Sequence, residues 1–304
     1  MSQRTFIDEQ RRNRRSSILL AVIISLFLLG LVTIITFFFV APDAVIYVLP
    51  FSLVIIIIYT WSMYQYGDRL VLSSTKARPA EGDEFTYLNN VVEGLSIAAG
   101  VPPPKVYVID NSDINAFAAG RDPQHASITV TTGALKTLSR EELEGVVGHE
   151  MSHVRNHDVQ FMTYIVAIVG IVSILSHIIL LWAELSVMSG GGRRRGRNGG
   201  GGSIIFLVVG LILAIFAPLA VALIEFAISR RREFLADAGG AELTRYPEGL
   251  ASALEKIMKT NQGGMKVDAA VSPLFISDPN KSGLSNLFAT HPPLAERIKR
   301  LRQM

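Results

Sequence analysis

The 304-residue sequence contains no cysteine, which excludes disulfide bonds, thiolate metal ligands and a cysteine nucleophile. Histidine is also scarce, with six residues in the whole chain. Any metal site in this protein must therefore be built from imidazole and carboxylate groups.

Charged residues make up only 18% of the chain, and they are absent from residues 17–40 and 44–63. Each of these stretches is long enough to cross a hydrocarbon core of about 30 Å. Two further apolar stretches, 159–183 and 203–224, bring the expected number of membrane spans to four. The second pair can alternatively form a buried hairpin, because it contains Gly170, His177 and Pro218.

Basic residues flank the first apolar stretch and predict its orientation. The arginines before residue 17 place the N-terminus in the cytoplasm. The loop 190–202 is also rich in arginine, which disfavours its export and leaves the crossing of the second pair open. Because the basic runs abut membrane segments and lack interleaved aromatic residues, we expect no nucleic-acid binding.

The pentad His149-Glu150-Met151-Ser152-His153 carries the main functional signal. Two histidines four residues apart share one face of a helix, so both can ligate a single Zn²⁺. Glu150 can then act as a general base toward a water molecule that the metal activates. His157 lies two turns from His149, so we interpret His157 and Asp158 as helix-end or supporting groups.

The residues before the pentad predict the helix that such a site needs. Ser139 and Glu142 have the spacing of a capping box at the start of a helix. Gly145 and Gly148 are poor helix formers. They indicate either close backbone packing near the metal or plain tolerance of glycine.

A third ligand is expected in a later segment. Glu233 and Asp237 are four residues apart, so Glu233 can bind the metal while Asp237 accepts a hydrogen bond from a ligand histidine. The competing interpretation of these residues is an ordinary charged helix face. The upstream pentad favours the metal site.

The charged parts of the chain predict a domain with a small sheet. Residues 105–109 and 127–131 have the pattern of strands, and residues 87–99 and 247–259 that of helices. The segment 115–120 is either an exposed edge strand that binds an extended peptide or a hairpin without a ligand.

The C-terminal part adds a loop and one more candidate group. Residues 261–285 are rich in Gly, Ser, Asn and Pro and predict a mobile loop or lid. His291 precedes Pro292 and Pro293, which we expect to start a final helix. His291 can donate to a transition-state oxyanion or simply stand at the start of that helix.

Together these motifs resemble the HtpX protease family, which consists of membrane-embedded bacterial zinc endopeptidases distantly akin to CAAX prenyl endopeptidases. The resemblance extends over nearly the whole chain and rests on residues 149–153, 233–237, 115–118 and 290–293. It implies a gluzincin-type fold, heat-stress-associated quality control of misfolded or damaged membrane proteins, and an inner-membrane location. The residues to which it gives roles are His149, His153 and Glu233 as zinc ligands, Glu150 as base, Asn115, Ala116, Phe117 and Ala118 at the substrate edge, and His291 near the site.

We therefore expect an α+β, mainly helical, multi-pass membrane protein with four spans and a cytosolic gluzincin-type protease domain containing a small β-sheet. The expected parts are an N-terminal membrane hairpin (1–64), a first protease segment (65–158), a second membrane hairpin (159–227) and a second protease segment (228–304). The expected cofactor is one Zn²⁺ per chain, with the active site facing the cytoplasm. The expected partners are polypeptide substrates, the lipid bilayer and other membrane quality-control proteases. The alternative is a catalytically silent membrane scaffold or chaperone-like binder that keeps a structural zinc.

Overall fold

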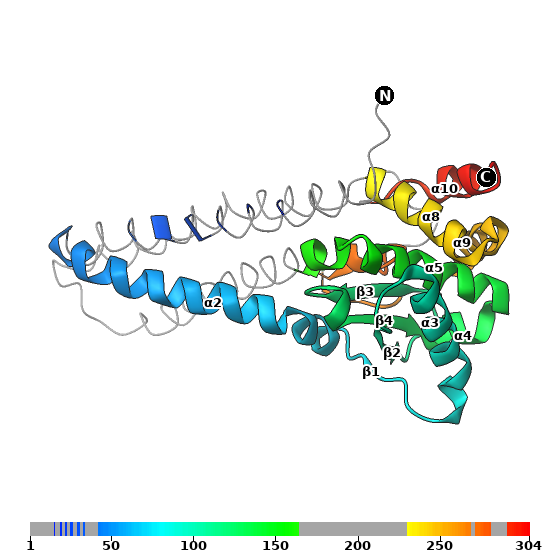
Figure 1. Ribbon diagram of the computed structural model, residues 1–304, viewed down its shortest axis with the longest axis horizontal. Helices are drawn as coiled ribbons and strands as arrows, with labels where there is room; N and C mark the ends of the chain where they lie inside the picture. The colour runs from blue at the N-terminus through cyan, green and yellow to red at the C-terminus, as the bar shows by residue number, and fades with distance from the viewer. Residues whose placement is uncertain are drawn as a thin grey trace, which may run out of the picture.

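The computed structural model describes residues 42–163, 230–268, 271–280 and 291–304, with a few further residues between 15 and 33. It has a long helical arm, α2, that leads into a compact α+β body (Figure 1). The helices are α2 (Val45–Ser74), α3 (Thr86–Ala99), α4 (Thr132–Thr137), α5 (Arg140–Arg155), α8 (Arg230–Thr244), α9 (Pro247–Thr260) and α10 (Leu294–Leu301). The strands are β1 (Arg78–Pro79), β2 (Lys105–Ile109), β3 (Ala116–Gly120) and β4 (Ala126–Thr131).

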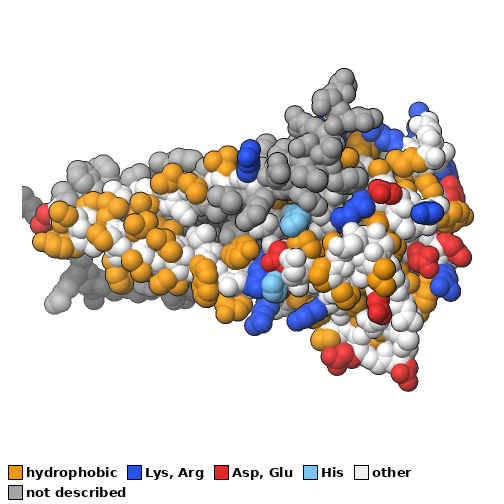
Figure 2. Space-filling view, in the orientation of Figure 1, with side chains coloured by type: hydrophobic (Ala, Val, Ile, Leu, Met, Phe, Trp, Pro, Cys, Tyr) orange, Lys and Arg blue, Asp and Glu red, His pale blue; other side chains and the backbone are white. Residues whose placement is uncertain are grey.

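Helix α2 is the one helix within the described residues that is long and apolar enough to cross a membrane. Its 30 residues amount to about 45 Å at 1.5 Å per residue, so it is longer than a hydrocarbon core. Hydrophobic side chains cover this arm, whereas most of the charged side chains in view gather over the α+β body (Figure 2). The other three expected spans, 17–40, 159–183 and 203–224, lie wholly or largely outside the described residues.

One contact links α2 to the first apolar stretch. The hydroxyl groups of Ser25 and Thr60 are 3.3 Å apart. The chain at residue 25 therefore lies beside α2, which is the arrangement expected of a membrane hairpin.

The sheet is small and mixed, with the strand order β1-β2-β4-β3. Strands β2 and β4 are parallel, and β3 pairs antiparallel with β4 so that Phe117 lies opposite Thr129. The predicted strands 105–109 and 127–131 are therefore confirmed, as is the mainly helical α+β class. Residues 116–120 form a hairpin with the next strand, because β3 pairs antiparallel with β4.

Strand β3 lies at the edge of the described sheet, but all five of its residues are buried. Ala116 and Ala118 belong to the core cluster that α3, α5 and α9 complete. Phe117 belongs to a second cluster on the other face, together with Val71 of α2 and Phe275. Strand β3 therefore has the expected edge position, but its residues are buried because the strand is covered on both faces.

The segment between α9 and α10 is anchored where the structure describes it. The Asp113 carboxylate accepts the backbone N–H groups of Gln262, Gly263 and Gly264, at 3.3, 3.1 and 3.0 Å. The side chain of Asn261 binds the backbone of Ile114 through both its oxygen and its nitrogen. In the described part of the expected lid, residues 261–264 are therefore held against the body by two buried polar side chains.

Candidate metal centre

Helix α5 presents the pentad to the interior of the protein. The predicted capping box is present, with the Ser139 N–H donating to the Glu142 carboxylate at 2.6 Å and the Glu142 N–H facing the Ser139 hydroxyl at 3.4 Å. The helix continues through His149 and His153 to Arg155 without a break. Because the two imidazoles are one turn apart, their Nε2 atoms come within 3.2 Å of each other.

Glu233 in the first turn of α8 completes a three-residue cluster. Its carboxylate oxygens lie 3.8 Å from Nε2 of His149 and 3.6 Å from Nε2 of His153. One ligand atom from each residue lies within 4.8 Å of the other two. Two helices separated by the chain between residues 155 and 230 thus place two imidazoles and one carboxylate around one point.

Glycines allow α5 and α8 to approach closely enough for this. A Cβ added to Gly240 of α8 would lie 2.8 Å from the backbone nitrogen of His149. A Cβ on Gly145 would lie 2.5 Å from the backbone of Leu250 in α9, and one on Gly148 would be 3.3 Å from the Gly240 carbonyl oxygen. Close packing is therefore the reason for glycine in this helix, rather than tolerance alone.

Each histidine of the cluster has a carboxylate partner on its other ring nitrogen. Oδ1 of Asp237 lies 3.0 Å from Nδ1 of His149, and Oδ2 of Asp158 lies 3.1 Å from Nδ1 of His153. Such partners fix the tautomer and the ring orientation of an imidazole whose Nε2 faces a metal.

Buried charge is concentrated at this site. The buried acidic groups around the cluster are Glu150, Asp158, Glu233 and Asp237, and the buried basic groups are Arg232 and Arg297. Counted over these described residues with both imidazoles neutral, as metal ligation requires, negative charge exceeds positive charge by two. Because buried charges need compensation, one divalent cation bound by the cluster fits this balance.

The donor set points the same way. Imidazole and carboxylate groups are ligands that zinc accepts, and zinc hydrolases use three protein ligands with an open fourth position. Among the described residues, the buried Oε2 of Glu233 has ion-pair neighbours but no hydrogen-bond partner. A metal ion held by Glu233 and the two histidines would give this buried carboxylate a partner.

The protonation equilibria of the site follow from burial and from its neighbours. Burial raises the pKa of Glu150 to about 7, and burial together with the Arg297 charge lowers the pKa of His149 to about 4. Burial alone would lower the pKa of His153, but its hydrogen bond to Asp158 and the charge of Glu233 outweigh this effect and raise the pKa to about 9. Burial likewise opposes ionisation of Glu233, yet His291 and Arg297 hold its pKa well below the usual value.

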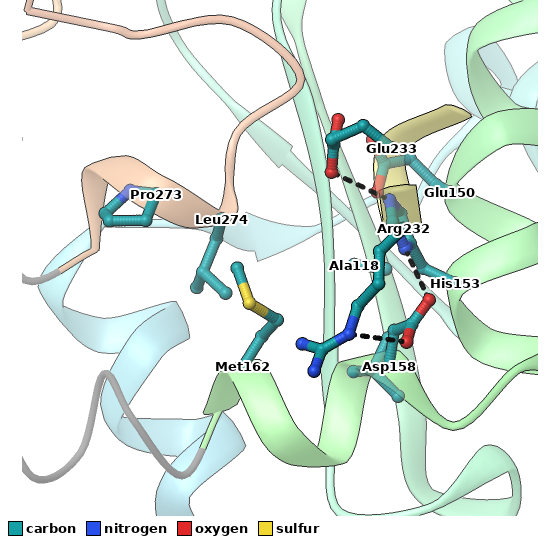
Figure 3. A pocket seen from close by; sticks show the side chains of 10 residues that line it. Ala118, Glu150, His153, Asp158, Met162, Arg232, Glu233, Pro273 and Leu274 are labelled. Carbon is teal, nitrogen blue, oxygen red and sulfur yellow. Dashed lines mark hydrogen bonds and ion pairs between the residues drawn. The ribbon is translucent and has the colours of Figure 1, made fainter. Parts of the chain in front are cut away.

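A pocket opens beside the cluster (Figure 3). Its polar wall contains Glu150, His153, Asp158, Arg232 and Glu233, and its apolar wall contains Ala118, Val159, Met162, Pro273 and Leu274. Arg232 extends along the pocket past Asp158 toward Met162 (Figure 3). A ligand in this pocket would therefore meet Glu150 at one end and an apolar surface from three separate chain segments on the other side.

The residues expected at the substrate edge have different surroundings. The backbone of Ala118 lowers the pKa of Glu150 against the larger effect of burial, and both residues line the pocket. The ring of Phe117 lies on the other face of the sheet, 4.8 Å from the ring of Phe275. Asn115 is 0% exposed, and its amide nitrogen donates to the carbonyl oxygen of Ser277 at 3.0 Å.

Part of the outer edge of β3 is paired within the chain, because the carbonyl oxygen of Ala116 accepts the N–H of Ile276 at 2.9 Å.

His291 is close to the cluster. Its Nδ1 lies 3.1 Å from Oε2 of Glu233, and the residue stands just before α10. The helix itself begins at Leu294 with Pro293 as its N-cap, rather than at the two prolines.

Sequence reasoning missed Arg232 and Arg297 as residues of the site. Arg297 occupies the buried stripe of α10 together with Leu294, Ile298 and Leu301. A charged residue at a core position of an amphipathic helix was the available signal. For Arg232, which lies in a run of three arginines, the sequence offered no such signal.

This combination of helices, histidines and carboxylates defines a metallopeptidase, and comparison with known proteins gives its family. The profile described as peptidase family M48 matches residues 83–304. The chain therefore belongs to peptidase family M48, and within it to the HtpX proteases.

The curated relatives support this assignment over the full length. A protein named Protease HtpX homolog from Caldanaerobacter subterraneus subsp. tengcongensis is 44% identical over 306 residues, covering 100% of this chain and 99% of that protein. Proteins with the same name from Dictyoglomus thermophilum and Streptococcus mutans are each 41% identical, covering 99% and 96% of this chain and 95% and 97% of theirs. Among solved structures, that of S. mikatae Ste24p matches with a TM-score of 0.48 and 23% identity, covering 97% of this chain and 67% of that one.

Proposed function

We propose that this protein is a membrane-bound zinc endopeptidase in which His149, His153 and Glu233 bind one Zn²⁺ and Glu150 is the general base. The observation that carries the proposal is the convergence of three ligand atoms within 4.8 Å beside a pocket that Glu150 lines. When bound, zinc supplies a Lewis acid that lowers the pKa of water and polarises a carbonyl group.

The chain's own residues account for the remaining steps of peptide hydrolysis. Glu150 accepts a proton from the attacking water and passes it to the leaving amine. The backbone of Ala118 favours the ionised form of Glu150 that this step requires. Asp237 and Asp158 orient the two ligand imidazoles. His291 lies beside Glu233, and we assign it the role of a hydrogen-bond donor to the oxyanion that develops on the substrate carbonyl.

The substrates that we propose are misfolded or damaged membrane proteins. Leu274 lines the pocket and also packs in the cluster that contains Val71 and Leu72, near the end of α2. Arg121, directly after β3, reaches Gln65 and the ring of Tyr64 on the same helix. The pocket therefore lies close to the end of α2 where aromatic residues typical of a membrane interface are found, which suits a substrate held at the bilayer surface.

The same proposal includes the topology and the domain division. Residues 1–64 and 159–227 form two membrane hairpins, and residues 65–158 and 228–304 form one protease domain on the cytoplasmic side of a bacterial inner membrane. The joining of α5 and α8 at the cluster supports this, because residues 149, 153 and 233 must then lie on the same side. Ala116, Phe117 and Asn115 support the substrate edge of β3 from within, and Ala118 faces the substrate.

The proposal is tested by comparing Glu150→Gln with His149→Ala in the detergent-purified full-length protein. Glu150→Gln should retain zinc and lose at least 100-fold in casein hydrolysis, because general base catalysis contributes about 10²–10⁴-fold. His149→Ala should lose both zinc and activity. Glu144→Gln, at a half-buried carboxylate on α5 that pairs with Arg140 and lies outside the pocket, serves as the matched control and should behave as wild type.

Two outcomes would contradict the proposal. A Glu150→Gln protein with full activity would exclude the assigned base. Zinc-containing wild-type protein without any peptidase activity would favour the alternative, a membrane scaffold with a structural zinc.

A further inference from the structure

Arg297 has surroundings that are unusual for a charged side chain. It is 0% exposed and lies on α10. Its guanidinium lies between the cluster of His149, His153 and Glu233 and Ile276, which follows the short helix η5 (Ser272–Leu274). Burying a guanidinium requires that nearly all of its donors find partners. The partners of Arg297 are therefore informative about what the residue does.

The first partner is Asp237, the carboxylate that orients His149. Nε and Nη2 of Arg297 donate to Oδ2 and Oδ1 of Asp237 at 2.9 and 2.7 Å, which is a two-point, fork-like pair. Oδ1 of Asp237 is in turn 3.0 Å from Nδ1 of His149. The same guanidinium approaches Glu233, with Nη1 3.5 Å from Oε2.

The second partner lies outside the cluster. Nη1 of Arg297 donates to the carbonyl oxygen of Ile276 at 3.2 Å, and the N–H of Ile276 donates to the carbonyl oxygen of Ala116 in β3 at 2.9 Å. Two residues further along β3, Ala118 lines the same pocket as Glu150. One side chain thus connects the partner of a metal ligand to the strand beside the catalytic pocket.

We propose that Arg297 is a positioning residue that holds the ligand set of the metal and the edge of β3 in a fixed relation. This inference rests on the proposed zinc site. Lysine cannot perform the role, because a point charge lacks the planar fork that grips Asp237 at two atoms while a third nitrogen reaches Ile276.

The charge of Arg297 and its geometry predict opposite effects on metal affinity. A buried cation near a Zn²⁺ site repels the metal, so its removal would tighten binding if charge alone mattered. If positioning dominates, removal weakens binding, because partners of ligand histidines contribute about 10–100-fold to metal affinity. Whether zinc affinity rises or falls when Arg297 is replaced therefore distinguishes the charge effect from the positioning effect.

The experiment measures zinc affinity by chelator competition on full-length protein in detergent, together with kcat and KM for a fluorogenic peptide. Arg297→Gln should weaken zinc binding by about 10–100-fold. Arg297→Lys should also weaken it and lower kcat at saturating zinc, although it keeps the charge. Arg302→Gln is the matched control, since Arg302 is exposed at the end of the same helix and pairs with Glu248 and Glu255.

A coupling measurement separates positioning from a general loss of stability. Asp237→Asn and Arg297→Gln remove the same contact. The zinc affinity of the double variant should therefore be about equal to that of whichever single variant binds zinc less tightly. Additive losses would overturn the inference, as would unchanged or tighter zinc binding in both Arg297 variants with normal kcat. If Arg297→Gln does not fold, the zinc affinity and kcat of Arg297→Lys decide. A wild-type protein that binds no zinc would refute the proposed function itself, whereas normal wild-type zinc binding with unaffected Arg297 variants would refute only this inference.

Discussion

Gly240 of α8 lies against the backbone of His149 in α5, so closely that a Cβ at this position would be 2.8 Å from the His149 nitrogen. The distance between the two helices, and hence the position of Glu233 relative to the histidines, depends on this contact. The geometry of the cluster of His149, His153 and Glu233 therefore depends on the lack of a side chain at position 240 as well as on the three residues themselves.

Replacing this glycine should disturb the fold and the site together. Gly240→Ala forces the helices apart, and we expect a loss of about 1–3 kcal/mol in stability, as for other overpacked cores. Thermal unfolding of the purified protein in detergent measures this loss, and zinc content should fall in parallel.

Gly94 supplies the matched control for that substitution. It lies inside α3, and an added Cβ would have no heavy atom within 4 Å. Gly94→Ala should be neutral or stabilise the protein by up to about 1 kcal/mol, because alanine is the better helix former. Equal melting temperatures for Gly240→Ala and wild type would show that the close approach is unimportant.

The loop after α9 should depend on a single carboxylate. Asp113 accepts three successive backbone N–H groups, so Asp113→Ala leaves these donors without their acceptor and should release residues 262–264. We expect trypsin to cleave after Lys266 about tenfold faster, since a local opening eased by about 1.4 kcal/mol is ten times more populated. Asp110→Ala, at an exposed carboxylate paired with Arg78, should leave the cleavage rate unchanged. The same slow rate in both variants would contradict an anchoring role for Asp113.

The membrane position of α2 can be read from Trp61. The chain has two tryptophans, at positions 61 and 182, so Trp182→Phe leaves Trp61 as the only one. Trp61 is 55% exposed on α2, and we expect brominated lipids to quench its fluorescence strongly because tryptophan prefers the membrane interface. Quenching by aqueous acrylamide but not by brominated lipid would place this helix outside the bilayer.

The sequence predicted the local parts of this site well. The capping box, the helix through His149 and His153, and the shared helix face of Glu233 and Asp237 all depend on residues at most four apart, where helical periodicity is decisive. Of the two interpretations left open for the glycines of α5, the structure favours close packing, although the sequence could not say which helix approaches them.

The contacts that the sequence did not predict join segments far apart in the chain. Arg297 and Asp237 are 60 residues apart, and Asn115 and Ser277 are 162 residues apart. Such pairs follow from how α8, α10 and β3 pack, which no periodicity encodes. The burial of β3 is a similar case, because the segments that cover it come from both ends of the chain.

The central claim is that His149, His153 and Glu233 bind the same zinc ion. The most direct test is metal analysis and zinc X-ray absorption spectroscopy on wild type and Glu233→Ala, with far-UV circular dichroism to verify the fold. We predict one zinc per chain in wild type, with two imidazoles and oxygen ligands, and loss of most of the zinc in Glu233→Ala. Full zinc content with an unchanged absorption spectrum in Glu233→Ala would contradict the account.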